Sequence, residues 1–202
     1  MTDTPPLRLT REQRQSQTRQ QLLDAGRRLI VEKGYGGASL RDIAQAAGFS
    51  QGAFYSNFAS KEDLLLELLR EHMAAETEQL GAIFGGTDTS TTALMAGLER
   101  WATSLDQSPQ WCVLAVELLL HAQRSPTFAL AYHAVWNTHH AQIAGFIEAL
   151  FARHQRELPQ PAQALATTFM ALAHGLALHR VGTTPVPAGQ MILTLLRGLL
   201  GV

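Results

Sequence analysis

The chain has 202 residues, of which 46% are hydrophobic and 16% are charged. This length and composition exclude disorder along the whole chain and allow one or two domains with a real core. The single cysteine, Cys112, excludes an internal disulfide framework and a cysteine-based zinc cluster. Because no secretory signal and no long uncharged apolar stretch are visible, we expect a soluble, cytoplasmic protein with no membrane partner.

The net charge of −1 conceals an uneven distribution. Nine positive and five negative side chains lie between the N-terminus and Lys61, whereas seven positive and twelve negative side chains follow. A basic segment joined to an acidic one indicates that the first contacts a polyanion and the second does not.

Three helix-capping pairs occur in the first sixty-odd residues. A hydroxyl residue is followed three positions later by an amide or carboxylate at Thr10 with Gln13, Ser39 with Asp42, and Ser60 with Asp63. Each pair predicts a helix start. We expect a flexible arm over 1–10, a first helix over 11–33 that stops at Gly34, and a second over 40–47 that stops at Gly48.

A third helix is expected directly after a three-residue turn. Ser50 is its predicted cap, and Phe54 and Phe58, four residues apart, can anchor it to the first two helices. Gln51, Tyr55 and their polar neighbours then occupy the opposite side. Eight residues make a rod of roughly 12 Å, comparable with the width of the B-DNA major groove.

The run from Ser39, SLRDIAQAAGFSQGAFYSNFASKEDLL, resembles the helix-turn-helix of the TetR/AcrR family of bacterial regulators. The match includes the Gly-x-x-Tyr pattern of the third helix and the Ser-Lys-Glu that opens the fourth. The resemblance implies an all-α chain with a three-helix DNA-binding domain over 11–62 and a larger effector-binding and dimerisation domain over 63–202. It also implies a transcriptional regulator, most often a repressor, and not an enzyme.

Carried over by position, the resemblance predicts a DNA-contacting set. Ser39 and Lys61 lie at helix N-termini, which favour phosphate, while an amide or a methyl group can read a base edge. The predicted residues are Ser39, Ser50, Gln51, Gly52, Ala53, Tyr55, Ser56, Asn57 and Lys61. Family members often have Lys, Thr, His and Tyr where this chain has Gln51, Ala53, Ser56 and Asn57. The operator sequence of this protein therefore cannot be inferred from the operators of its relatives.

Longer periodic segments without any strand pattern fill the rest of the chain. Helices are expected over 61–84, 91–106, 109–123, 126–156, 161–181 and 187–200. The last two carry apolar stripes too wide for one neighbour to bury, so we expect them to pair with their symmetry copies in a homodimer. The predicted interface residues are Leu165, Phe169, Leu172, Leu176, Ile192, Leu195, Leu196 and Leu199. A twofold dimer predicts a palindromic double-stranded DNA target.

Bulky and polar-tipped residues in the middle helices are candidates for an effector pocket. They are Trp101, Trp111, His121, Phe128, Tyr132, Trp136 and His140. Taken alone, each residue is better explained as core packing or as a surface or hydrogen-bonded histidine than as a ligand contact. Because charged residues are sparse there, the pattern favours a small hydrophobic or aromatic effector, whose binding would change the angle of the fourth helix and release the operator.

Two other classes of function stay open. A metal-responsive regulator would draw on histidines that have no His-Glu-x-x-His or cysteine-pair spacing, namely His121, His133, His139, His140 and His174. A helical enzyme is the weaker alternative, since the sequence has no Gly-x-Ser-x-Gly elbow and no phosphate-binding loop. No cofactor is predicted.

Overall fold

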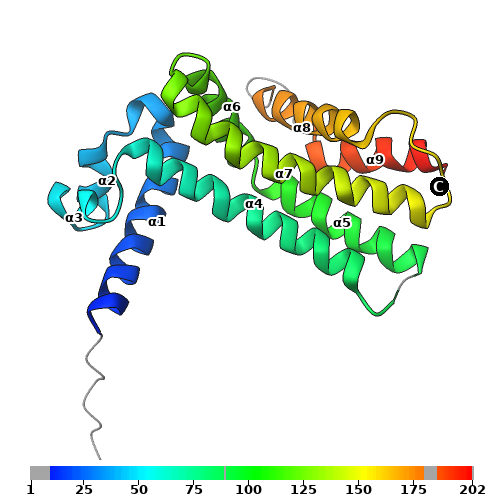
Figure 1. The fold of residues 1–202 in the computed structure, drawn as a ribbon, viewed down its shortest axis with the longest axis horizontal. Coiled ribbons are helices and arrows are strands. Elements are labelled where there is room, and N and C mark those ends of the chain that lie inside the picture. The colour runs from blue at the N-terminus through cyan, green and yellow to red at the C-terminus, as the bar shows by residue number, and fades with distance from the viewer. Residues whose placement is uncertain (1–9, 89, 180–185, 202) are drawn as a thin grey trace, which may run out of the picture. The chain divides into compact units, whose positions relative to one another are not determined.

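The structure is a computed structural model that describes residues 10–88, 90–179 and 186–201. These residues form nine helices and no strand (Figure 1). The all-α prediction is therefore confirmed. The chain divides into two compact units, one ending at Leu68 and the other beginning at Leu69. The expected arm over 1–10 lies, apart from Thr10, outside the described residues.

The first unit contains α1 (Arg11–Gly37), α2 (Leu40–Ala46), α3 (Gln51–Tyr55) and the start of α4 (Lys61–Gly85). Its predicted caps are present. Thr10 and Ser39 each form a capping box with the third helical residue, and Ser60 Oγ accepts from the backbone N–H of Asp63 at 3.1 Å. Since each cap satisfies an orphan N–H, the local sequence fixes where these helices begin.

Two helices of this unit differ from the sequence prediction. Gly34 has φ 72° and ψ 173°, so regular α-helix stops there as expected, but a further helical turn carries α1 to Gly37. The third helix spans five residues rather than the expected eight. The N–H of Phe58 still bonds to the carbonyl of Phe54 at 2.9 Å, so the chain completes one more turn before it leaves the helix.

The core of the first unit holds α3 against its neighbours. Phe54, Phe58 and Leu64 are at most 1% exposed. Gly26 in α1 lies so near α4 that an added Cβ would be 2.6 Å from Leu64 Cδ2. The glycine therefore permits the close approach of α1 and α4.

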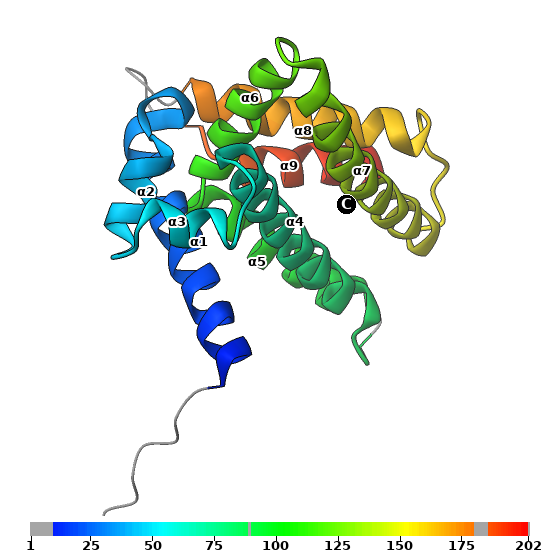
Figure 2. The same cartoon turned by 60° about the vertical axis from the view of Figure 1, so that its left-hand side comes forward.

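The second unit contains the rest of α4 and five further helices: α5 (Thr91–Gln107), α6 (Gln110–Ala122), α7 (Pro126–Arg153), α8 (Ala162–Leu178) and α9 (Ala188–Leu200). Helix α5 packs on α9, α7 packs on α8, and α8 also contacts α6 and α9, as the two ribbon views show (Figures 1 and 2). The predicted helix order is confirmed. Helix α7 ends at Arg153, before the expected residue 156, because Gln155 adopts φ 53°. Helix α8 ends at Leu178. Its expected end at residue 181 lies outside the described residues.

Asp106 fixes the start of α9 on α5. Its carboxylate accepts from the backbone N–H groups of Gly189 at 2.7 Å and Gln190 at 3.2 Å. A Cβ at Gly189 would lie 2.1 Å from the carbonyl oxygen of Ala102. This contact therefore requires glycine, and it sets the position of the C-terminal helix in the core.

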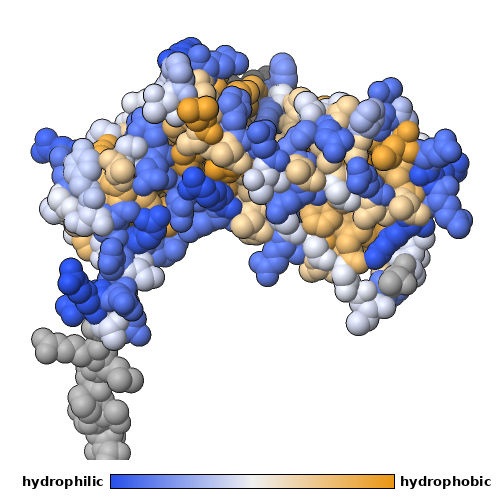
Figure 3. Space-filling model, viewed as in Figure 1, coloured by the Kyte–Doolittle hydropathy of each residue, from blue (hydrophilic) through white to orange (hydrophobic). Residues whose placement is uncertain are grey.

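The surface of the chain carries hydrophobic patches interrupted by hydrophilic side chains on the face seen in Figure 3. Among the described residues, none of the helices combines the length and apolarity that crossing a membrane requires.

Candidate nucleic-acid interface and ligand cavity

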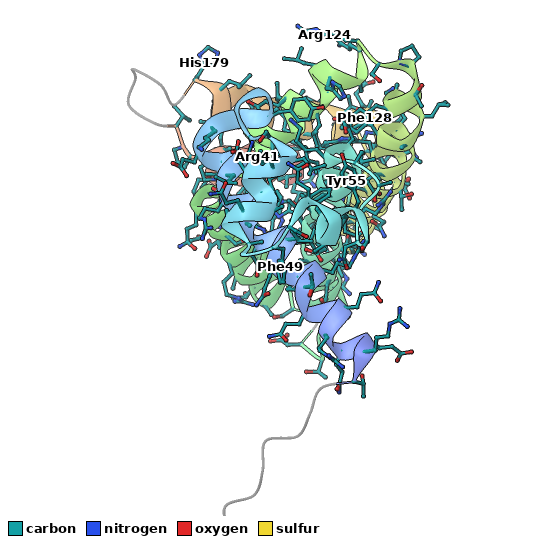
Figure 4. All side chains as sticks on the ribbon, turned by 90° about the vertical axis from the view of Figure 1, so that its left-hand side faces the viewer. Arg41, Phe49, Tyr55, Arg124, Phe128 and His179 are labelled. Atoms are coloured by element: carbon teal, nitrogen blue, oxygen red, sulfur yellow. The ribbon has the colours of Figure 1, made fainter. Side chains whose placement is uncertain are left out.

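Helix α3 presents a polar face to solvent. Ser50 Oγ accepts from Ala53 N at 3.2 Å and so begins the helix. Buried Phe54 fixes the inner side, whereas Gln51 and Tyr55 are exposed, Tyr55 at 59%. Figure 4 labels Tyr55 on α3 and Arg41 on the preceding helix α2. The amphipathic division predicted for this helix is present, with a small exposed polar face above a buried aromatic anchor.

Two of the predicted base-reading side chains bond to the carbonyls of their own helix. Ser56 Oγ donates to Gly52 O at 2.9 Å, and Asn57 Nδ2 donates to Ala53 O at 2.8 Å. Asn57 is also half-buried. A base contact by Asn57 would therefore require a change of rotamer, while Gln51, Gly52 and Tyr55 need none.

Lys61 connects the end of α1 to the start of α4. Its Nζ donates to Tyr35 O at 2.7 Å and Ala38 O at 3.1 Å, and lies 4.0 Å from the centroid of the Tyr35 ring. Ser39 is exposed and donates its hydroxyl to Asp42 Oδ2 at 2.7 Å. This hydrogen bond and the backbone N–H of Ser39 lower the pKa of Asp42. Both predicted phosphate-binding residues thus also hold helix ends together.

Arg19 holds the segment that follows α3, a role that sequence reasoning missed. Its guanidinium donates to Asn57 O at 2.6 Å, pairs with Glu67 Oε1 at 3.3 Å, and lies 4.1 Å from the centroid of the Phe58 ring. Thirty-eight positions separate Arg19 from Asn57. No local periodicity reports a contact over such a separation.

A cavity of about 80 Å³ lies within the second unit. It is lined by residues of every helix of that unit, including three of the seven predicted effector residues: Trp101, Trp111 and Trp136. Phe169 and Ile192, predicted at the dimer interface, line it as well. The cavity is mostly aromatic and apolar, which is typical of small-molecule sites.

The other four predicted effector residues lie elsewhere. The rings of His121 and Phe128 are 4.8 Å apart, and Phe128 and Tyr132 are 6.0 Å apart, so these three form an aromatic cluster that reaches the ring of Trp136. His140 Nε2 lies 2.7 Å from the hydroxyl of Thr167 at the surface. None of the four lines the 80 Å³ cavity.

A carboxylate that sequence reasoning missed, Glu76 of α4, lines the cavity. Its Oε1 accepts from Trp101 Nε1 at 3.1 Å, and its Oε2 lies 3.3 Å from His139 Nε2. Burial raises the pKa of Glu76, but the hydrogen bond with His139, the charges of His139 and His72, and the Trp101 hydrogen bond together hold it below its usual value. The side chain is therefore ionised at neutral pH.

Three histidines surround this carboxylate in the cavity wall. His72 stacks on Trp111 with ring centroids 4.3 Å apart, and His174 meets Trp136 edge-on at 5.5 Å. Burial lowers the pKa of His174 and so favours its uncharged form. In the described part of the chain, no three His, Cys, Asp or Glu side chains converge closely enough to hold a metal ion.

An exposed apolar stripe follows α8 and α9. Met191, Leu195 and Leu199 are spaced four residues apart on α9 and are 37%, 44% and 42% exposed, and Leu178 at the end of α8 is 50% exposed. The predicted interface residues Leu165, Phe169, Ile192 and Leu196 lie instead in the core of the second unit, and Leu172 and Leu176 are half-buried.

Both units match known protein families. Residues 22–68 match the bacterial regulatory proteins of the tetR family, and residues 90–201 match the C-terminal domain of BetI-type transcriptional repressors. The HTH-type transcriptional repressor AcnR of Corynebacterium efficiens is 28% identical over 137 residues, which is 68% of this chain and 65% of AcnR. The matched region thus spans just under two thirds of that relative.

Solved structures share the fold at low sequence identity. A regulator from Saccharomonospora viridis in complex with choline has a TM-score of 0.67 at 21% identity, covering 92% of this chain and 96% of that one. FadR from Bacillus subtilis in complex with stearoyl-CoA has a TM-score of 0.69 at 18% identity, covering 91% and 98%. Two such different ligands on one fold mean that the fold alone does not specify ligand chemistry.

Proposed function

The chain belongs to the TetR family of bacterial regulatory proteins, and we propose that it is a homodimeric repressor, released from a palindromic operator when a small molecule occupies the aromatic cavity. The observation that carries the proposal is the exposed polar face of α3 above buried Phe54 and Phe58. In a helix-turn-helix the second helix lies in the major groove with its N-terminal residues on base edges, and a buried aromatic anchor would hold α3 in the orientation that this requires.

The exposed residues of α3 divide into two roles. Gln51 carries an amide, which can bind adenine in bidentate fashion and so select sequence. The Tyr55 hydroxyl and the backbone at Gly52 suit phosphate contacts, which position the protein without reading sequence. Ser39 and Lys61, which lie at the N-termini of α2 and α4, would add phosphate contacts at the edges of this surface.

The dimer supplies the second reading helix. We assign its interface to the exposed stripe of Met191, Leu195 and Leu199 on α9 and to the neighbouring exposed face of α8, where small residues such as Ala164 and Ala171 permit close approach. Burial of these leucines against a symmetry copy removes apolar surface from water, which drives association. The two reading helices then meet half-sites about one DNA turn or a small multiple of it apart.

Helix α4 connects the cavity to the DNA-binding unit. Leu64 and Leu68 near its start are fully buried in the first unit, and His72 and Glu76, two and three turns further on, line the cavity. A ligand that prefers one position of α4 would therefore bias the spacing of the reading helices. Such coupling requires different ligand affinities in the DNA-bound and released states.

Footprinting on the intergenic DNA beside the coding region tests the proposal at a stated salt concentration. We expect the wild-type protein to protect a palindrome that the Gln51→Ala, Tyr55→Ala double variant does not protect. Gln123→Ala, which removes an exposed glutamine of the second unit, should protect it like the wild type. Absence of protection by an intact wild-type dimer would contradict the regulator function.

A further inference from the structure

We propose that the first turns of α1 form a second DNA-contacting surface, on which Arg11 and Arg14 bind phosphates of the duplex whose major groove α3 enters. This inference rests on the proposed DNA-binding function and extends it beyond the helix-turn-helix. The base-contacting and phosphate-contacting residues proposed above all lie between Ser39 and Lys61, so α1 has no DNA contact among them.

The start of α1 projects from the core of the first unit. Every residue from Arg11 to Gln17 is exposed, and the first buried residue of the helix is Leu22. Both ribbon views show these turns extending past α2 and α3 (Figures 1 and 2). The projecting segment, residues 11–17, therefore adds nothing to the core of its own unit, and its side chains are available to another molecule.

The local sequence nevertheless keeps the projecting segment helical. Thr10 Oγ1 accepts from Gln13 N at 3.1 Å while Gln13 Oε1 accepts from Thr10 N at 2.8 Å, and Arg14 Nε donates to Thr10 O at 3.5 Å. Because the segment continues a longer helix, each of its residues adds a hydrogen bond without a new nucleation cost. Its side chains are thus presented in the fixed register of a helix.

The arginines of the projecting segment lie on the core-facing side of α1. Eleven residues make about three turns of helix, so Arg11 lies on the same side as Leu22, and Arg14 on the same side as Ala25. Leu22 and Ala25 are 0% and 3% exposed. A helix that packed further within the unit would continue this side with apolar residues. Guanidinium groups at these positions suit a charged partner instead.

Arg19 indicates which way this side of α1 faces. Its guanidinium donates to Asn57 O, directly after α3. Arg11 precedes Arg19 by roughly 12 Å along the helix and lies about 80° from it around the axis. It therefore faces broadly the same side of the unit as the end of α3. When α3 lies in a major groove, the sugar–phosphate backbones that border the groove lie beside it, which brings phosphates to this side.

The charge of the projecting segment supports a polyanion as the partner. The first nine residues of α1 carry three arginines and one carboxylate, Glu12. Arg19 is paired with Glu67 at 3.3 Å, whereas Arg11 and Arg14 are exposed beyond that pair. A guanidinium group presents a rigid fork of N–H donors that matches the geometry of phosphate. Each such contact also releases counterions from the duplex, which favours binding.

An acidic protein surface is the alternative partner, because the chain after Lys61 carries an excess of negative charge. Duplex DNA is favoured over it, since the projecting segment belongs to the same compact unit as α3. A duplex bound by α3 is therefore already held next to this unit, and its phosphates are regularly spaced along both strands.

The salt dependence of DNA binding tests the proposal. Log affinity falls linearly with log salt concentration, with a slope of about −0.9 for each phosphate contact. Fluorescence anisotropy of the full-length protein with a labelled duplex that carries the footprinted palindrome gives this slope. We expect the Arg11→Gln, Arg14→Gln double variant of a dimer to lose about two to four units of slope, and its affinity at about 0.1 M salt to fall tenfold or more.

Two matched variants separate charge in the projecting segment from total charge. Arg100→Gln, Arg124→Gln removes two exposed arginines of the second unit and should keep the wild-type slope. Arg11→Lys, Arg14→Lys keeps the charges and should keep most of the slope. Because the substituted side chains are exposed and glutamine and lysine favour helix about as well as arginine, circular dichroism and thermal unfolding should match the wild type.

Phosphate ethylation interference locates the contacts. We expect each half-site to contain phosphates whose ethylation weakens binding of the wild type but not of the Arg11→Gln, Arg14→Gln variant. Because phosphate contacts carry no base information, the ratio of affinities for the operator and for its single-base variants should be the same in both proteins.

An unchanged salt slope or an unchanged ethylation pattern in the folded glutamine variant would overturn the proposal. So would an equal loss in the lysine variant or in the Arg100, Arg124 variant. A changed sedimentation coefficient without DNA, together with an unchanged slope, would assign the segment to a protein partner instead.

A duplex of the same length and scrambled sequence separates these outcomes from the regulator function. Loss of slope on the scrambled duplex would support the phosphate contacts of Arg11 and Arg14 even if no operator were protected. Operator protection by a glutamine variant with the wild-type slope would leave the DNA-binding function standing and refute the contacts of α1.

Discussion

Arg19 of α1 donates a hydrogen bond of 2.6 Å to the backbone carbonyl of Asn57, the second residue after α3. The same guanidinium lies over the Phe58 ring and pairs with Glu67 at the start of α4. One side chain thus joins α1, the segment after α3, and the helix α4 that continues into the second unit. Hydrogen bonds from a charged donor are stronger than neutral ones, so this contact is well suited to fix the orientation of α3.

Replacement of Arg19 by methionine should weaken operator binding roughly tenfold, because loss of a charge-assisted hydrogen bond costs about 1.5–3 kcal/mol, part of which falls on the DNA-bound orientation of α3. The matched control is Arg28→Met, which removes the same charge from an exposed position on α1. Fluorescence anisotropy with labelled operator measures both. Equal losses in the two variants would mean that Arg19 acts by charge alone.

Gln51→Ala should relax specificity at one base pair in each half-site, since a bidentate contact of an amide with adenine contributes about 1–3 kcal/mol of discrimination. Tyr55→Phe should instead weaken binding to all sequences by a similar factor, because a phosphate contact carries no base information. Binding to a library of single-base operator variants distinguishes the two. If Gln51→Ala weakened every operator equally, the assignment of Gln51 to a base edge would be incorrect.

Local signals determine most of the first unit, and the sequence predicts it well for that reason. The hydroxyl caps at Thr10, Ser39 and Ser50 act on N–H groups three residues away, so their effect is visible in the sequence. The length of α3 was overestimated because its end depends on tertiary packing of Phe58 rather than on a glycine or proline. The Arg19 contact was missed for the same reason, as it joins residues distant in sequence.

The residues that line the cavity were predicted less well from the sequence than the helices of the first unit. Tryptophans were recognised as candidates by size, and three of them do line the cavity. Periodicity does not distinguish a helix face that lines a cavity from one that packs against a neighbouring helix. Phe128 and Tyr132 were therefore predicted as effector-binding residues, although their rings pack in a cluster outside the cavity. Glu76 is one of six acidic residues in α4, and the sequence does not show that its side chain, which is 17% exposed, lines the cavity.

Leu195→Glu combined with Leu199→Glu should convert the dimer to a monomer, because two carboxylates would be desolvated in an apolar interface. The protomer itself should stay folded, since both side chains are more than 40% exposed. Sedimentation velocity measures the oligomeric state and circular dichroism the fold.

Leu130→Glu provides the control for this interface, as Leu130 is 78% exposed and belongs to α7, which is not part of the proposed interface. It should leave the dimer intact. A dimer that survives both glutamates at 195 and 199 would exclude the α9 stripe from the interface.

Gly189→Ala should destabilise the second unit by about 1–3 kcal/mol, since the new methyl group would overlap the carbonyl of Ala102 and force α9 away from α5. Gly145→Ala is the matched control: it lies in the middle of α7 with nothing within 4 Å of an added Cβ. That change should stabilise by roughly 0.5–1 kcal/mol, because alanine loses less backbone entropy in a helix. Urea unfolding of both variants gives the two free energies, and a stable Gly189→Ala protein would show that α9 can shift at little cost.

The reactivity of Cys112 should report the desolvation of the cavity wall. Burial, followed by the nearby carboxylates of Glu76 and Asp106, raises the pKa of this thiol to about 11. Because only the thiolate reacts, alkylation of the folded protein by iodoacetamide should be slow at pH 8 and should rise about tenfold for each pH unit up to about pH 10. In denaturant the rate should instead level off above roughly pH 9, near the ordinary pKa of cysteine. A plateau below pH 9 in the folded protein would show that water reaches Cys112, and the desolvation of this part of the cavity wall would then be contradicted.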